Sequence, residues 1–129
     1  MEVSLSVLKI STDNKIEIFS CDMDSALKEV FGHDYEFVYP KYLDRRFVMV
    51  VDGFGYQKEL EPNLIGCYFY GTMYNDTPIL GDILILRNKS SYSGNSIEEL
   101  SIEEAVELHS LTSDIMSLRG VYSNFIEGI

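Results

Sequence analysis

Cysteine is scarce in this sequence of 129 residues, which contains only Cys21 and Cys67. Disulfide-stapled domains and zinc sites need several cysteines or clusters of cysteine and histidine, and the sequence has neither a CxxC pair nor a histidine cluster. The core must then be stabilised by packing alone. A chain of this length is large enough to bury such a core. We expect a single domain over residues 1–129, with no metal and no cofactor.

Long apolar runs are also missing. No window approaches the roughly 18 apolar residues that cross a bilayer. The start of the chain, Met1–Leu5, lacks the basic and apolar regions of a signal peptide. We therefore expect a cytoplasmic protein without a membrane partner.

Basic residues are few, since ten Lys and Arg stand against 21 Asp and Glu for a formal net charge of −11. A surface of that sign repels a phosphate backbone, which argues against general DNA or RNA binding. The acidity has two interpretations. It keeps the protein soluble, or it forms an acidic face that docks on a basic protein surface.

A recognisable set of reacting groups is missing too. His33 and His109 have no local nucleophile or metal-ligand spacing beside them, and a general base needs a placed partner. Asp52–Gly55 is a glycine turn rather than a phosphate loop, because it lacks the third glycine and the following helix. Cys67 lies in an apolar segment, where cysteine is usually inert. The sequence therefore favours a protein that is not an enzyme.

Two short apolar runs dominate the middle of the chain, Phe47–Val51 and Ile83–Leu86. Such runs, rich in Val and Ile and bounded by turn residues, are typical of strands buried in the middle of a sheet. Alternating apolar residues predict further strands over Val3–Ile10, Lys15–Phe19 and Tyr35–Tyr39. The first two of these are expected to form a hairpin.

Helical periodicity appears in two places. Asp22–Phe31 carries one apolar stripe behind a capping aspartate. A capping box at Ser101 opens the last helix, which is predicted to run over Ile102–Leu118 and to end at Gly120. Leu64–Gly71 is interrupted by glycines and is predicted as a short helix followed by a strand, with a bent strand as the alternative.

The end of the chain is more apolar than a free tail would be, with Val121, Tyr122, Phe125 and Ile126. We expect residues 119–129 to pack on the domain or on a second copy of the protein, and hence a homo-oligomer. Ser90–Ser96 is polar and is predicted to be a mobile surface loop. Together these patterns predict an α+β fold, a mixed or mainly antiparallel sheet of about five or six strands with two principal helices packed on it.

Tyrosines and basic residues occur together on either side of the first apolar run. Aromatic rings stack on nucleobases and arginine binds phosphates through two parallel hydrogen bonds, so a small nucleotide-like ligand fits such a group. The alternative is that the tyrosines lie at the edge of the core and the arginines pair with Asp44 and nearby glutamates. The predicted ligand-binding residues are Tyr35, Tyr39, Lys41, Tyr42, Arg45, Arg46, Tyr68 and Tyr70.

A series of turn glycines, strand cores and an acidic helix start extends over roughly residues 1–110. Its members are Gly32, Tyr35-Glu36-Phe37-Val38, Val50-Val51-Asp52-Gly53, Glu61-Pro62-Asn63, Gly71, Gly81-Asp82-Ile83-Leu84-Ile85 and Leu100-Ser101-Ile102-Glu103-Glu104. In this order the chain resembles the domain-of-unknown-function 3846 family of phage and mobile-element proteins. The resemblance brings no reaction or catalytic residue, and it implies a counter-defence role in a host cell only by association.

Two functions follow as expectations. The first is a non-enzymatic counter-defence protein that sequesters a small nucleotide-type immune signal, supported by the tyrosine and arginine residues. The second is an acidic interaction protein that inhibits a basic host protein surface by charge mimicry, supported by the net charge.

Overall fold

The computed structural model of the chain describes residues 5–72, 77–91 and 94–127. The strand pairings in it are antiparallel, which confirms the predicted α+β class with a mainly antiparallel sheet. In chain order the elements are β1 (Val7–Ile10), β2 (Ile16–Phe19), α1 (Met23–Phe31), β3 (Tyr35–Val38), β4 (Phe47–Asp52), α2 (Leu64–Tyr70), β5 (Ile83–Ser91), β6 (Gly94–Glu98) and α4 (Ile102–Glu127).

The sheet is built around β5. Its strand order is β2-β1-β5-β4-β3, and β6 also pairs with β5. β1 pairs with residues 83–85 of β5 and β6 with residues 87–91, so both use the same edge of that strand. Ser6 and Leu100 join them through two backbone hydrogen bonds of 2.9 and 2.8 Å. The predicted hairpin of β1 and β2 is confirmed.

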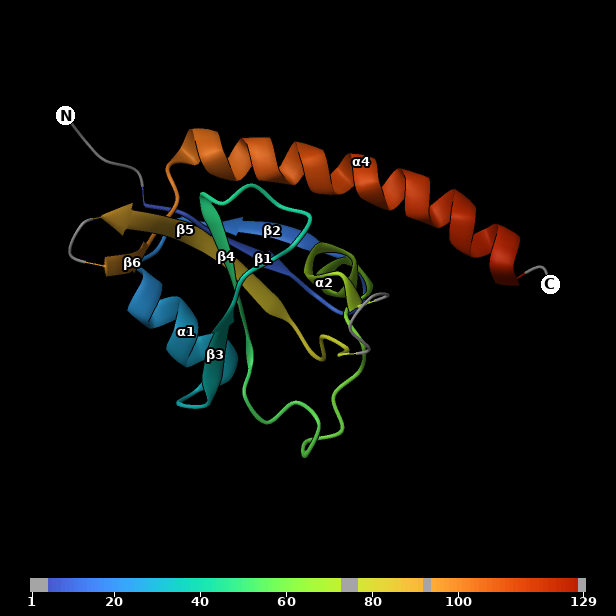
Figure 1. Cartoon of the computed structure of the whole chain (residues 1–129), viewed down its shortest axis with the longest axis horizontal. Helices are drawn as coiled ribbons and strands as arrows, with labels where there is room; N and C mark the ends of the chain where they lie inside the picture. The colour runs from blue at the N-terminus through green and yellow to red at the C-terminus, as the bar shows by residue number, and fades with distance from the viewer. Residues whose placement is uncertain (1–4, 73–76, 92–93, 128–129) are drawn as a thin grey trace.

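The central strands are buried on both faces, which explains their unbroken apolar runs. In β4, Phe47, Met49 and Val51 pack into the core on one face, and Val48 and Val50 pack into the core on the other. The first core includes residues of α2 and α4, and the second includes residues of α1. Figure 1 shows the corresponding arrangement, with α1 and α4 on opposite sides of the sheet.

Polar caps begin the two shorter helices. Asp22 caps α1 at the surface, where its Oδ2 accepts a 3.0 Å hydrogen bond from the Ser25 N–H. Asn63 caps α2 from a fully buried position. The predicted helix over Leu64–Gly71 is confirmed, but the strand after it is wrong, because Gly71 adopts the left-handed conformation (φ 82°) and ends the helix there.

Two other boundaries differ from the sequence predictions. Ser90–Ser96 is not simply a loop, because β5 continues to Ser91 and β6 begins at Gly94. Strand pairing uses backbone groups, which a polar sequence also provides. The last helix does not end at Gly120 but continues to Glu127, since a glycine inside a helix lowers its stability by only about 1 kcal/mol.

Within the described ranges, no helix has the length and apolar character needed to cross a bilayer.

An ion-pair network joins the start of α4 to the sheet. Arg87 of β5 donates from Nη1 to Glu98 at 3.0 Å and from Nε to Glu104 at 2.9 Å. Glu104 also completes the predicted capping box, accepting a 2.9 Å bond from the Ser101 N–H. Burial raises the pKa of Glu104, but hydrogen bonds from Arg87 and Ser101 outweigh it, so the pKa lies below its ordinary value of 4.5.

Stability should therefore depend on pH through Glu104. A carboxyl whose pKa is lowered by folding stabilises the native state above its unfolded pKa, and that contribution is lost as the pH falls through the folded pKa. Replacing Glu104→Gln should destabilise the protein at about pH 7 and by clearly less at about pH 3. Urea unfolding of both proteins at both pH values tests this. An equal difference at the two pH values would contradict the assignment.

Candidate functional site

Three of the eight predicted ligand-binding residues come together beside α2. The Tyr42 and Tyr68 rings have centroids 5.9 Å apart, and the Lys41 ammonium lies 5.7 Å from the Tyr42 centroid. A 2.9 Å hydrogen bond from the Tyr42 N–H to the Phe69 carbonyl holds the loop after β3 against the helix. Lys41, Tyr42 and Tyr68, here called the tyrosine pair with its lysine, therefore form a local surface of the predicted kind.

The contacts of the two arginines are with other residues than this tyrosine pair with its lysine. Arg46 Nη2 donates to Glu107 of α4 at 3.0 Å, and its Nε lies 3.3 Å from Asp44. The hydrogen bond to Glu107 raises the pKa of Arg46, and its guanidinium carbon lies 4.9 Å from the Phe47 ring centroid. Arg46 thus follows the alternative interpretation, pairing with Asp44 and a glutamate. Arg45 is exposed, and its carbonyl accepts a 3.5 Å bond from Asn88.

The remaining tyrosines are dispersed. Tyr35 is at the opposite end of β3 from the loop, paired with Asp52, and its ring contacts Phe37 at a centroid distance of 5.6 Å. Tyr39 is exposed, whereas Tyr70 is half-buried against the core shared by α2 and α4. The structure therefore does not bring all eight predicted residues into one site.

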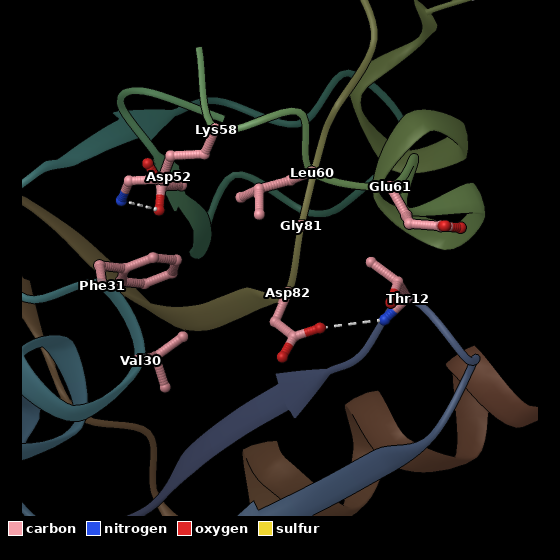
Figure 2. A pocket seen from close by; sticks show the side chains of 9 residues that line it. All are labelled: Thr12, Val30, Phe31, Asp52, Lys58, Leu60, Glu61, Gly81 and Asp82. Atoms are coloured by element: carbon pink, nitrogen blue, oxygen red, sulfur yellow. Dashed lines mark hydrogen bonds and ion pairs between the residues drawn. The ribbon is translucent and has the colours of Figure 1, made fainter. Parts of the chain in front are cut away.

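A cleft of about 380 Å³ opens at the end of the sheet where Tyr35 lies. Figure 2 shows side chains from the end of α1, the segment after β4 and the start of β5 gathered around one space. Three carboxylates and one ammonium line it beside apolar side chains. The lining residues are Thr12, Val30, Phe31, Asp52, Lys58, Leu60, Glu61, Gly81 and Asp82.

Two of the carboxylates are held in position by backbone N–H groups, and one of them also by a lysine. Asp52 accepts from the Phe54 N–H at 2.8 Å and pairs with Lys58 at 2.8 Å. Asp82 accepts from the Thr12 N–H at 3.1 Å.

The charges of the cleft do not balance. The Lys9 ammonium lies 3.6 Å from Asp82, and Lys58 is already paired with Asp52. Glu61 is exposed at the rim, and its carboxylate has no ion-pair partner among the described residues. The cleft is therefore an acidic surface whose nearby lysines are engaged with its own carboxylates.

A glycine allows the wall of the cleft to form. Gly81 has φ 83°, and a Cβ built on it would lie 2.7 Å from Leu60 Cδ1. Its N–H donates to the Glu61 carbonyl at 2.7 Å. Because a residue with a side chain would be strained at this positive φ, Gly81 permits the close approach of the two segments that carry Glu61 and Asp82.

Two arrangements that are common in catalytic sites are not formed among the described residues. Over these ranges, no group of three or more His, Cys, Asp or Glu is arranged to hold a metal ion. On the exposed face of α4, Ser113 Oγ lies 3.5 Å from His109 Nδ1, which is longer than the contact of a general base with its nucleophile. What the cleft offers is binding chemistry, namely negative charge beside an apolar wall.

No protein-family model, curated protein or solved structure matches the chain. The resemblance to the domain-of-unknown-function 3846 family stays a prediction. Function must therefore be inferred from the geometry of the chain's own residues.

Sequence reasoning missed the cleft because its walls come from distant segments. Thr12, Asp52 and Asp82 are brought together only by the pairing of β1, β5 and β4. The sequence did contain one local signal near the cleft. Asn63 directly precedes an apolar segment, as a residue that caps a helix does.

Proposed function

We propose that the protein is a non-enzymatic binding protein of a phage or mobile element, whose acidic surface docks on a basic surface of a host protein and inhibits it. The acidic cleft carries the proposal. Its three carboxylates outnumber its one ammonium, and the net charge of the chain is −11. The setting in a phage or mobile element rests on the family resemblance alone.

The chemistry of the cleft suits arginine and lysine side chains of a partner. Such side chains carry a charge at the tip of a long apolar stem. Glu61 adds a carboxylate at the rim of the cleft that could meet the charge, while Phe31 and Leu60 offer an apolar and partly aromatic wall to the stem. Surrounding carboxylates would also speed the encounter with a basic surface.

An octa-arginine peptide is a suitable probe for this proposal, since it presents guanidinium groups without a folded partner. We expect the full chain to bind it and to release it as salt rises, because salt screens interactions between exposed charges. Binding that is absent at low salt, or present and insensitive to salt, would contradict the proposal.

A second candidate function is the sequestering of a small nucleotide-type immune signal. One observation favours it, namely that the tyrosine pair with its lysine places two aromatic rings and an ammonium together at the surface. The Tyr42 and Tyr68 side chains are 43% and 37% exposed. A base stacked on a ring and a phosphate near Lys41 would use both kinds of group.

This second function predicts a ligand that co-purifies. Protein purified from bacteria with an active nucleotide-signalling defence should carry a nucleotide-sized mass in native mass spectrometry. Replacing Lys41→Ala should reduce that bound fraction about tenfold, because a charge-assisted phosphate contact is lost. Lys89→Ala is the matched control, since Lys89 is exposed on β5, and it should keep the ligand. Purely apo protein from such hosts would count against sequestering.

A further inference from the structure

Strand β3 lies at one edge of the sheet and exposes aromatic side chains. The strand order ends at β3, which pairs only with β4 among the described strands. Tyr35 and Phe37 are 38% and 39% exposed, and Tyr39, directly past the end of the strand, is 55% exposed. A cluster of exposed apolar side chains on a soluble protein typically marks a surface that binds another molecule.

The aromatic residues of β3 share one face of the sheet. Residues two apart in a strand point in the same direction. The rings of Tyr35 and Phe37 have centroids 5.6 Å apart, and the ring of Tyr35 lies 6.4 Å from that of Phe31 at the end of α1. Val38 points the other way and packs against the core shared by α2 and α4. The exposed aromatic row therefore extends along the α1 side of the sheet.

The backbone of β3 also directs hydrogen-bonding groups away from β4. The Asp34 carbonyl accepts from the Gly53 N–H at 2.9 Å, in the same register as the pairing of β3 with β4. Successive residues of an antiparallel strand alternate between bonding to the neighbouring strand and pointing away from it. Glu36 therefore bonds to β4, whereas Tyr35 and Phe37 direct their N–H and C=O groups outward. A further extended strand can bond to all of these groups.

The outward groups limit how a second copy of β3 can pair with this edge. The outward residues are the odd-numbered ones, so odd-numbered residues of an antiparallel second copy must lie opposite them. Two such registers overlap along most of the strand. One is centred on Glu36 and places two glutamates directly opposite each other, which is destabilising. The other is centred on Phe37, with Phe37 opposite its own copy and Tyr35 opposite Tyr39.

The register centred on Phe37 suits two copies of an acidic chain. With a net charge of −11, two copies repel each other unless they meet where acidic side chains are not opposed. In this register Glu36 lies opposite Val38 of the second copy, so the only charged side chain of the strand faces an apolar one. The aromatic residues face one another, and aromatic pairs across two strands stabilise a sheet.

We propose that two copies of the protein pair through β3, edge to edge and antiparallel about Phe37, so that their sheets join into one. The exposed parts of Tyr35, Phe37 and Tyr39 amount to roughly 260 Å² per copy, at about 200 Å² for a whole aromatic side chain. Stable interfaces bury about 1,200 Å² or more in total, so we expect a dimer that dissociates on dilution. This goes beyond the proposed docking function, which does not require a dimer.

Disulfide trapping with the full chain tests the register. In the proposed pair the two copies of position 37 lie directly opposite, with Cα atoms about 5.5 Å apart and within reach of a disulfide. The two copies of position 36 are diagonal neighbours, about 7–8 Å apart and beyond that reach. Phe37→Cys should therefore form a covalent dimer on mild oxidation, and the matched control Glu36→Cys should form about tenfold less. Peptide mapping by mass spectrometry should place the link at position 37 rather than at Cys21 or Cys67.

A proline variant tests the hydrogen bonds of the pair. Phe37→Pro removes an N–H that points away from β4, so it costs no bond within the sheet but removes two from the pair. In analytical ultracentrifugation, the unchanged protein should rise with concentration from the chain mass of 14.7 kDa toward twice that mass. Phe37→Pro should stay monomeric over the same range. Circular dichroism melts check that each variant is folded.

Three results would overturn the proposal. If the unchanged protein is monomeric at every concentration, the copies do not pair. If Glu36→Cys is trapped as efficiently as Phe37→Cys, the strands do not meet in the register centred on Phe37. If folded Phe37→Pro dimerises as well as the unchanged protein, the dimer forms at another surface of the chain.

Discussion

Asn63→Ala is expected to lower the free energy of unfolding by about 4 kcal/mol, which makes Asn63 the most sensitive polar position we identify. Its Oδ1 accepts from the Gly66 N–H at 2.9 Å, capping α2. Its Nδ2 donates to the carbonyls of Ile10 at 2.9 Å and Gly81 at 3.0 Å. With alanine at this position, all three backbone partners would lose these hydrogen bonds. They are buried, and a buried polar group without a hydrogen bond is costly.

The control is the other capping residue of the same kind. Asp22→Ala also removes an N-cap, but Asp22 is exposed, and among the described residues its side chain bonds to Ser25 of its own helix start. We expect it to cost much less stability than Asn63→Ala. Urea unfolding should show a much lower midpoint for Asn63→Ala than for Asp22→Ala with similar slopes. Equal midpoints would show that the hydrogen bonds from Asn63 to Ile10 and Gly81 add nothing to the free energy of unfolding.

The same residue connects the core to the cleft. Through its bonds to Ile10 and Gly81, Asn63 holds the end of β1 and the turn before β5 at a fixed separation. Thr12 and Asp82, which follow these two residues, form one side of the cleft and bond to each other. The geometry of the acidic surface therefore depends on a buried amide that is not itself part of it.

Much of the fold was predictable because it depends on local patterns. The run Phe47–Val51 is continuous because both faces of β4 are covered, and that pattern is visible in the sequence. β6 was not predictable in the same way, since its pairing with β5 is made by the backbone of a polar segment. The extension of α4 past Gly120 was missed because a glycine signals a helix end without enforcing it.

The candidate site was harder to predict than the fold. Tyr35 and Tyr42 are close in sequence, but one pairs at the far end of β3 and the other packs on α2. Arg46 was expected at a ligand, and it pairs with Asp44 and with Glu107, which is 61 residues away. Partners at such separations are set by how the helices pack on the sheet, for which a single sequence carries no local signal.

The second large effect is expected for docking on a basic surface. Affinity of the full chain for the octa-arginine peptide should fall about a hundredfold between about 0.05 M and about 0.5 M salt, because many exposed carboxylates contribute and each is screened. Fluorescence anisotropy of a labelled peptide measures this directly. An octa-glutamate peptide is the control, and it should not bind at any salt concentration.

Docking at the cleft, rather than anywhere on an acidic protein, is tested most directly by two variants of equal charge. Glu61→Gln removes the cleft carboxylate that has no ion-pair partner among the described residues. Glu103→Gln removes an exposed carboxylate on α4, which packs on the other face of the sheet from α1. At low salt we expect Glu61→Gln to weaken octa-arginine binding about fivefold and Glu103→Gln to leave it nearly unchanged. Equal weakening by both variants would show that binding follows net charge alone and would contradict a docking site at the cleft.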